Sequence, residues 1–212
     1  MRTNTMHLFV DAQHASPYAM SVYVALTEKT LPFTTAALDL SQGEQHGQAF
    51  GQVSLTARVP TLVHNGFSLS ESTAITEYLE AIAPHPPLYP DDVQQRAKAR
   101  QLQAWLRSDL MALRTERPTE VIFYGPSPEP LSPAGQAAAR KLIRAAEQLL
   151  GDGREHLFER WSLADLDLAL MLNRLVMNAD TVPDPLADYA RRQWQRPSIQ
   201  RWLALPRPPL AA

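Results

Sequence analysis

Apolar residues in the first 83 positions recur at two different periods, which predicts strands alternating with helices. Four short apolar runs have the length and composition of strands: Met6–Asp11, Phe33–Asp39, Thr61–His64 and Phe67–Leu69. Three stretches carry helical signals: residues 17–29, residues 43–50, and the segment with Ile75, Tyr78, Leu79 and Ile82 on one face. Asn65-Gly66 separates the last two strands and is typical of a tight hairpin turn. The predicted order is therefore βαβαββα.

The pattern changes after a proline-rich segment, because no convincing strand follows residues 84–90. Apolar residues then recur at helical spacing: Leu102, Trp105, Leu106, Leu110 and Leu113 in one long helix, Ala137–Leu150 in a second, Ser162–Met177 in a third, and shorter helices from Leu186 and Ile199. Ser162–Asp165 has the form of a capping box at the start of the third of these helices. We therefore expect an α/β domain at residues 1–83, a linker at 84–90 and an all-helical domain at 91–212.

Composition places the chain among ordinary globular proteins. Of its 212 residues, 45% are hydrophobic and 20% are charged, and the formal net charge is −2. Such a charge gives no field that would hold a polyanion, so we expect no nucleic-acid partner. No apolar stretch approaches the roughly 20 residues that span a bilayer, and the N-terminal segment lacks the features of a signal peptide. We expect a cytoplasmic protein without a membrane partner.

The absence of cysteine narrows the chemistry that this chain can perform. With no cysteine, it has no disulfide, no thiolate metal ligand and no cysteine nucleophile. Any thiol chemistry must therefore use the thiol of a bound small molecule.

The first candidate for chemistry is Ser16, which lies between a predicted strand and a helix that begins at Pro17. A serine followed by proline is a common helix start, so capping alone explains this pair. The amide groups of a helix start also favour anions, and a hydroxyl there can donate to a bound thiolate. His14 lies two residues away, but no acid partner accompanies it, so a serine hydrolase lacks the parts it needs.

The second candidate is Val59-Pro60, at the end of a polar loop before a strand. Proline is tolerated as the first residue of a strand, which is the simpler explanation. The alternative is a cis peptide bond in a tight turn. Such a turn would leave the N–H and C=O of Val59 free to pair with an extended peptide.

The third candidate is Ser70-Glu71-Ser72, where the hairpin meets a helix. Helix capping by Ser70 and a favourable helix-dipole interaction of Glu71 would account for these residues. The same residues could hold the end of an amino acid, with Ser72 and its amide on the α-carboxylate and Glu71 on the α-ammonium group. Each motif alone is weak, and their order and spacing together are much stronger.

Together these motifs resemble the glutathione site of the glutathione S-transferases, of the serine type. The resemblance spans nearly the whole chain, and it is strongest toward the bacterial YfcF-type subgroup. The segments similar to that subgroup are Arg100–Met111, Glu116–Phe123, Asp167–Val176 and Leu186–Arg196. The resemblance implies a thioredoxin-like N-terminal domain that binds glutathione, an all-helical C-terminal domain, a homodimer and no metal.

The resemblance also implies a role for individual residues. Ser16 would donate to the glutathione sulfur, Val59 would bond the cysteinyl backbone, and Glu71 with Ser72 would hold the γ-glutamyl end. Other expected contacts to glutathione are Arg58 and Gln45, with His46 as an alternative to Gln45, and Asp109 from the partner subunit, although a surface acid is the simpler explanation of Asp109.

The implied reaction is attack of the glutathione thiolate on a small hydrophobic electrophile. Trp105, Leu106, Met111 and Phe123 are candidates for the wall of the electrophile site, although such residues more often form core. Reduction of organic hydroperoxides would use the same thiolate, and the sequence does not separate the two activities. Maleylacetoacetate isomerisation is disfavoured, because the richer serine and cysteine motif of those relatives is absent. A non-catalytic binding module is the alternative from another class, since a fold does not fix a function.

Overall fold

The computed structural model describes residues 5–151 and 153–210 of the chain, so the first four and last two residues of the expected domains lie outside the described residues. Its residues group into two compact units. The first comprises the described residues up to Pro87 together with those from Pro197 onward, and the second is Leu88–Arg196. The C-terminal helix thus packs in the first unit, although it follows the helical segment in sequence.

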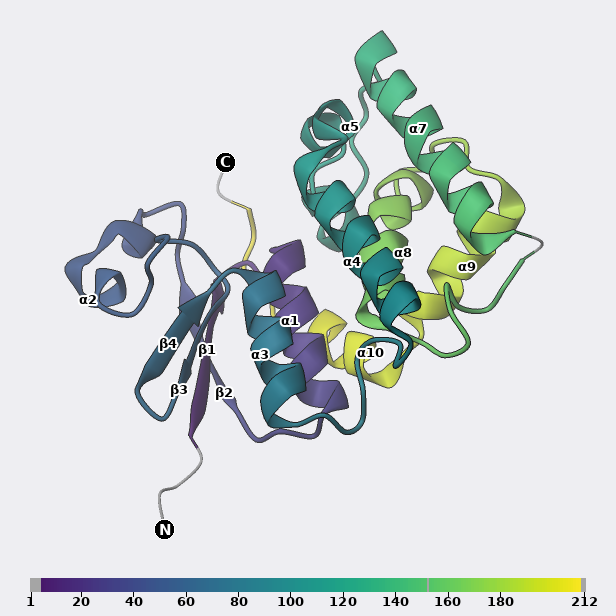
Figure 1. Ribbon diagram of the computed structural model, residues 1–212. Coiled ribbons are helices and arrows are strands. Elements are labelled where there is room, and N and C mark those ends of the chain that lie inside the picture. The colour runs from purple at the N-terminus through teal and green to yellow at the C-terminus, as the bar shows by residue number, and fades with distance from the viewer. Residues whose placement is uncertain (1–4, 152, 211–212) are drawn as a thin grey trace. The chain divides into compact units, whose positions relative to one another are not determined.

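A four-stranded mixed sheet forms the centre of the first unit (Figure 1). Its strands are β1 (Met6–Asp11), β2 (Thr34–Leu38), β3 (Thr61–His64) and β4 (Phe67–Ser70), in the spatial order β2-β1-β3-β4. β1 runs parallel to β2 and antiparallel to β3, and β3 pairs with β4 as a hairpin. Asn65 and Gly66 both have positive φ angles, 51° and 87°, which confirms the predicted turn.

Two helices lie side by side on one face of this sheet, α1 (Pro17–Glu28) and α3 (Ser72–Ile82) (Figure 1). The apolar residues of α1 are fully buried from Val22 to Leu26 apart from Tyr23, and Ile75 and Leu79 of α3 are also fully buried. Ile82, expected on the same buried face, is 42% exposed because it lies at the last turn of α3. The segment after β2 holds only a 3₁₀ turn, η1 (Glu44–His46), and the short α2 (Gln48–Gly51).

The last helix, α10 (Pro197–Leu203), packs against α1. Trp202 is completely buried, and its ring lies 5.2 Å from that of Tyr23 on α1. Residues beyond α10 are anchored as well, because Arg207 donates to the carbonyl oxygens of Leu203 and His14 at 2.8 and 3.2 Å. The described part of the tail is therefore attached to the first unit.

The second unit consists of helices within the described residues (Figure 1). They are α4 (Val93–Ser108), α5 (Met111–Glu116), α6 (Glu120–Phe123), α7 (Pro133–Leu150), α8 (Leu163–Val176) and α9 (Asp184–Trp194). Every residue of α8 from Leu163 to Leu175 is buried, so this helix is the centre of the unit.

The predicted capping box is confirmed: Asp165 accepts from the N–H and the hydroxyl of Ser162 at 2.8 and 2.9 Å. The fold implied by the sequence is thus confirmed.

One helix was wrongly predicted as continuous. The stripe from Leu102 to Leu113 is divided between α4 and α5, because Leu110 adopts a left-handed conformation with φ 61°. The Asp109 carboxylate accepts the N–H of Leu110 at 2.6 Å, a local bond that competes with the next helical hydrogen bond. Hydrophobic spacing did not reveal the break, since both helices bury the same stripe.

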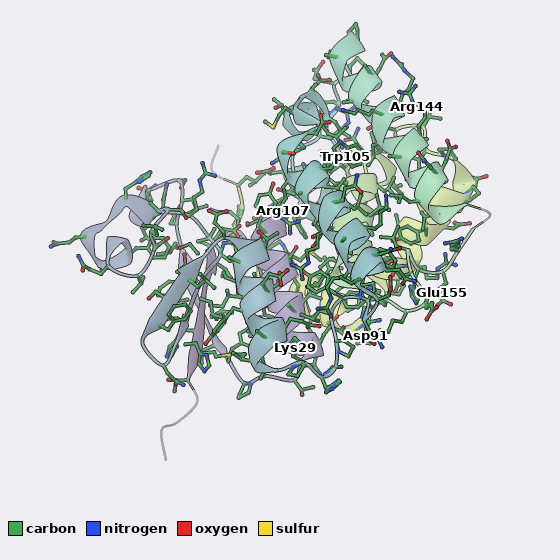
Figure 2. The ribbon with its side chains drawn as sticks, viewed as in Figure 1. Lys29, Asp91, Trp105, Arg107, Arg144 and Glu155 are labelled. Carbon is green, nitrogen blue, oxygen red and sulfur yellow. The ribbon has the colours of Figure 1, made fainter. Side chains whose placement is uncertain are left out.

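The proline-rich segment at 84–90 is held at both ends. Lys29, labelled in Figure 2, has a completely buried side chain. It forms an ion pair with Glu80 at 2.7 Å and donates to the carbonyl oxygens of Ala83 and Pro86. In the second unit, the carbonyl oxygen of Leu88 accepts from the N–H of Leu163 at 3.0 Å. Each end of the segment is therefore held by hydrogen bonds within its own unit.

Candidate functional site

The sheet brings three of the sequence motifs to one edge. Phe9 pairs with Thr61 and Thr61 with Ser70, so the end of β1 lies beside the start of β3 and the end of β4. The loop with Ser16, the turn with Val59 and the residues Glu71 and Ser72 continue from these three strand ends. The end of parallel β2, which leads to η1 and Gln45, lies at the same edge.

A buried carboxylate fixes the loop between β1 and α1. Asp11 is 4% exposed, and one of its oxygens accepts the N–H of Ala15 at 2.6 Å. Both oxygens accept the N–H of Ser16 at 3.1 Å. Sequence reasoning assigned Asp11 only to the end of a strand, because nothing in a single acid after an apolar run distinguishes a loop anchor from a surface residue.

The Ser16 hydroxyl has a proton to donate. As the N-cap of α1, its Oγ accepts the N–H of Ala19 at 3.2 Å, which uses a lone pair and leaves the O–H free. Among the described residues, no acceptor is bonded to this O–H. A hydroxyl held in this way, at the positive end of a helix, is suited to stabilise an anion.

The contacts of His14 do not fit the role of a general base for Ser16. Its Nδ1 donates to the carbonyl oxygen of Pro206 at 2.9 Å, and its ring meets the edge of Trp202 at 5.5 Å. These contacts tie His14 to the C-terminal segment, and they do not form the nucleophile–base pair of a serine hydrolase.

The Val59-Pro60 peptide bond is cis, as hypothesised from the sequence. Neither the N–H nor the C=O of Val59 makes a hydrogen bond within the part of the chain that the structure describes. Both groups remain available to an extended peptide.

A buried cluster of three hydroxyls supports this turn, and we call Ser54, Thr61 and Ser70 the hydroxyl cluster. Each pair of their side-chain oxygens lies 3.0 Å apart. Thr61 also donates to the carbonyl oxygen of Arg58 at 2.9 Å. The cluster therefore links the residue before Val59 to the residue before Glu71, although the two motifs lie apart in the sequence.

Glu71 has a backbone conformation that is unusual for a residue other than glycine. Its φ and ψ are 73° and 116°, outside the regions that are comfortable for a residue with a Cβ. Such a conformation costs of order 1–3 kcal/mol and tends to occur where a site requires it. The carboxylate is exposed and makes no hydrogen bond or ion pair with another described residue. Next to it, Ser72 is 5% exposed and begins α3.

The other expected contacts lie on loops of the first unit. Arg58 is exposed, and its guanidinium group has no partner among the described residues. Gln45 donates from Nε2 to the carbonyl oxygen of Leu40 at 3.5 Å, and its buried Oε1 has no partner among the described residues. His46 is exposed.

Asp109 belongs to the second unit and has local partners. Its carboxylate pairs with Lys141 and accepts from Nε1 of Trp105 at 2.8 Å. Hydrogen bonds to its carboxylate, first from Lys141 and then from the N–H of Leu110 and from Trp105, lower the pKa of Asp109 to about 2. Of the residues expected in an electrophile wall, Leu106 is 4% exposed within the helical core and Met111 is 58% exposed.

The described residues indicate neither a metal centre nor a membrane span. No cluster of three histidine, aspartate or glutamate side chains among them has the arrangement that a metal ion needs. None of the described helices combines the length and the apolarity that a bilayer crossing requires.

Family models and a solved structure that resemble this chain are all glutathione S-transferases. The model of the glutathione S-transferase N-terminal domain matches residues 12–87, and that of the C-terminal domain matches residues 92–207. A crystal structure of a glutathione transferase homolog from Burkholderia gl BGR1, with bound glutathione, is 45% identical with a TM-score of 0.78. That similarity covers 94% of this chain and 96% of the other.

Curated relatives match over shorter stretches. Human glutathione S-transferase theta-1 is 33% identical over 152 residues, which are 69% of this chain and 61% of the relative. A probable maleylacetoacetate isomerase 2 from Drosophila melanogaster is 37% identical over 95 residues, 44% of this chain and 42% of the relative. The chain thus matches less than two thirds of the length of these curated relatives. Since the two domain models together cover most of the sequence, the chain belongs to the glutathione S-transferase family.

Proposed function

We propose that this protein is a serine-type glutathione transferase, in which Ser16 stabilises the thiolate of bound glutathione. The observation that carries the proposal is the Ser16 hydroxyl, which accepts from Ala19 N and retains its proton at the start of α1. A thiolate sulfur beside it would accept that proton in a hydrogen bond. We place the protein in the YfcF-type subgroup, because four segments of its sequence are similar to that subgroup.

The energies are sufficient for this role. A free thiol has a pKa of about 8.5, and lowering it by two units requires roughly 2.7 kcal/mol of preferential binding to the anion. A hydrogen bond to a charged group contributes about 1.5–3 kcal/mol, and a helix N-terminus about 0.3–1 kcal/mol. Ser16 therefore needs no general base, in agreement with the engagement of His14 by Pro206.

The glutathione backbone would be held at the same edge of the sheet. Val59 would pair through its N–H and C=O with the cysteinyl residue, as an added strand does. Glu71 would pair with the α-ammonium group of the γ-glutamyl end, and the Ser72 hydroxyl and amide would hold its α-carboxylate. Arg58 and Gln45 would bind the glycyl carboxylate of glutathione.

In the proposed reaction the sulfur of the thiolate attacks an electrophilic carbon of a small hydrophobic substrate. A carbon–sulfur bond forms, and the leaving group departs with the electron pair of the broken bond. With an organic hydroperoxide, the sulfur would instead attack the terminal oxygen, releasing the alcohol. The glutathione sulfenic acid would then react with a second glutathione to give the disulfide and water.

We also propose that the protein is cytoplasmic and forms a homodimer. Two-fold symmetric dimers are the most common kind of symmetric oligomer. Light scattering after gel filtration would give the mass of a dimer. For Asp109, the bonds with Lys141 and Trp105 favour a role inside its own helical unit over a contact with glutathione.

The test is calorimetric titration with glutathione and a chlorodinitrobenzene conjugation assay on the native protein and on Ser16→Ala. We expect saturable binding, and conjugation at least tenfold slower in the variant while affinity holds. Ser132→Ala is the matched control, because Ser132 is the N-cap of α7 and accepts from Gly135 N at 3.1 Å. Ser16→Thr, which keeps a hydroxyl, should recover activity. Absent glutathione binding by the native protein would contradict the proposal and leave a non-catalytic binding module.

A further inference from the structure

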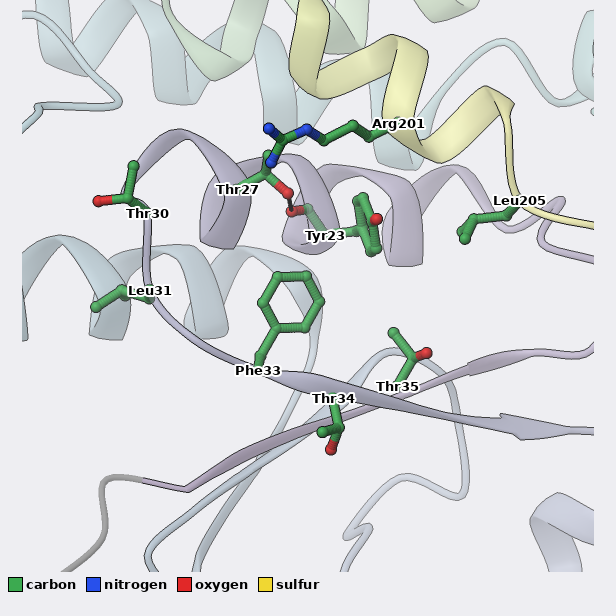
Figure 3. Close-up of a pocket in the computed structure, with 9 residues that line it drawn as sticks. All are labelled: Tyr23, Thr27, Thr30, Leu31, Phe33, Thr34, Thr35, Arg201 and Leu205. Atoms are coloured by element: carbon green, nitrogen blue, oxygen red, sulfur yellow. Dashed lines mark hydrogen bonds between the residues drawn. The ribbon is translucent and has the colours of Figure 1, made fainter.

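A hollow of about 520 Å³ lies in the first unit between α1, β2 and α10 (Figure 3). Its volume is within the roughly 300–1,000 Å³ typical of small-molecule sites. Nine residues line it: Tyr23, Thr27, Thr30, Leu31, Phe33, Thr34, Thr35, Arg201 and Leu205. We call this space the α10 pocket.

The α10 pocket is separate from the proposed glutathione residues. None of those residues lines it. Ser16 caps the first turn of α1, whereas Thr27 lies in the last turn, and 11 helical residues span about 16 Å. A ligand in the pocket would therefore leave the Ser16 hydroxyl accessible.

Two aromatic rings form a firm wall of the pocket. The rings of Tyr23 and Phe33 lie 5.2 Å apart at 85°, and both project into the space between α1 and β2 (Figure 3). Trp202 is completely buried behind Tyr23 and fixes the position of its ring. An edge-to-face pair held in this way offers a surface on which a planar ring can pack.

The pocket has one charge, and it is positive. Arg201 extends its guanidinium group from α10 toward Thr27 (Figure 3). This exposed group has no hydrogen bond or ion pair with another described residue, and no acid is among the nine lining residues. Glu28, next to Thr27, accepts instead from the hydroxyl of Ser198 and does not line the pocket.

Some hydroxyls of the pocket form hydrogen bonds within the protein, and others do not. Thr27 donates to the carbonyl oxygen of Tyr23 at 2.8 Å, and Thr30 donates to that of Lys29 at 2.7 Å. Thr34 is bonded to Nδ1 of His7 at 2.6 Å. The hydroxyls of Tyr23 and Thr35 have no partner among the described residues, so they remain for a polar group of a ligand.

We propose that the α10 pocket binds a small aromatic carboxylate. Its ring packs against Tyr23 and Phe33, and its carboxylate accepts from the guanidinium fork of Arg201, for which a planar two-oxygen anion is the matching partner. An inorganic anion would leave the aromatic wall uncovered, and a neutral ring would leave Arg201 without a partner. The inference does not rest on the proposed transferase activity.

The experiment is a calorimetric titration with 2-naphthoate on protein saturated with S-hexylglutathione, which occupies the proposed thiol site. We expect one equivalent to bind the native protein and affinity to fall at least tenfold in Arg201→Gln. The matched control is Arg144→Gln, because Arg144 is an exposed arginine on α7 of the other unit (Figure 2). Neutral 2-naphthamide should bind native protein and Arg201→Gln with similar, weak affinity.

Two further measurements locate the ligand. Thr35→Trp, which places a ring in the pocket, should abolish binding of 2-naphthoate while circular dichroism shows the native fold. Amide resonances of residues 27–35 should shift on titration, and those of residues 16–19 should not. No binding by the native protein, equal affinity in Arg201→Gln, or shifts confined to residues 16–19 would each overturn the proposal.

Discussion

The carboxylate of Asp11 accepts the backbone N–H of Ser16 with both of its oxygens at 3.1 Å. Asp11 is buried at the end of β1, and Ser16 begins α1, so one side chain connects the sheet to the hydroxyl proposed to meet the thiolate. The position of that hydroxyl therefore depends on an acid that does not itself need to touch glutathione.

Replacing Asp11 should misplace Ser16. In Asp11→Ala the N–H groups of Ala15 and Ser16 lose their acceptor, which costs about 1–3 kcal/mol of stability. We expect kcat for conjugation to fall at least tenfold and the pKa of bound glutathione, followed by thiolate absorbance, to rise. Asp188→Asn is the surface control, because Asp188 is bonded to exposed Arg191. An unchanged thiol pKa in Asp11→Ala would show that Ser16 is placed by other contacts.

The hydroxyl cluster should control glutathione binding more than the chemical step. Thr61→Val removes the donor to the carbonyl oxygen of Arg58, so the turn that carries Val59 loses an anchor. We expect the KM for glutathione to rise about fivefold, the equivalent of roughly 1 kcal/mol, with a smaller change in kcat. Thr61→Ser retains the hydroxyl and should restore the KM. A larger fall in kcat than rise in KM would contradict a role in binding.

Lys29 should be important for the stability of the first unit. Lys29→Met removes the ammonium group that pairs with the buried carboxylate of Glu80 and the donor to Pro86, a change worth about 3–5 kcal/mol. Urea unfolding should show this loss. The double variant Lys29→Met with Glu80→Leu should recover most of it, because the buried carboxylate is then absent as well.

The pair Asp109–Lys141 should produce a dependence of stability on pH in strongly acidic solution. The pKa of Asp109 is about 2, below the roughly 3.9 of an unfolded chain, so its contribution is present above about pH 4 and is lost as the pH falls toward 2. In Lys141→Gln, carbon NMR should detect a higher pKa for Asp109, still below the ordinary value because Trp105 and Leu110 continue to donate. Arg144→Gln, three residues further along α7, should leave the pKa of Asp109 at about 2.

Gly135 should resist a substitution that usually stabilises a helix. Alanine is favoured over glycine in helices by about 1 kcal/mol, but a Cβ at Gly135 would collide with Oε2 of Glu116. Glu116 accepts from the N–H and hydroxyl of Ser132 at the start of α7, and these bonds lower its pKa. We expect Gly135→Ala to lower the melting temperature and to raise the pKa of Glu116. A higher melting temperature would show that the Glu116 side chain moves aside at little cost.

Local sequence patterns were sufficient for most of the fold. The strands, the Asn65-Gly66 turn and the start of α1 at Ser16-Pro17 depend on residues near one another in the chain, whose side-chain size and backbone preferences decide the outcome. The same patterns predicted the capping box of α8. They missed the break at Leu110, because that break comes from a side-chain bond of Asp109 and leaves the apolar stripe unchanged.

The sequence by itself determined the order of the elements, the motifs at Ser16, Val59 and Glu71, and the absence of a cysteine nucleophile. Only the tertiary structure decided that Asp11 anchors Ser16, that three hydroxyls join the Val59 turn to Glu71, and that α10 packs on α1 beside a charged pocket. The physical reason is that the hydroxyl cluster and the packing of α10 join residues brought together by strand pairing or helix packing, whereas the Asp11 bond depends on the path of the loop between Asp11 and Ser16. Their energies depend on distance and burial in the folded chain, which local spacing does not encode.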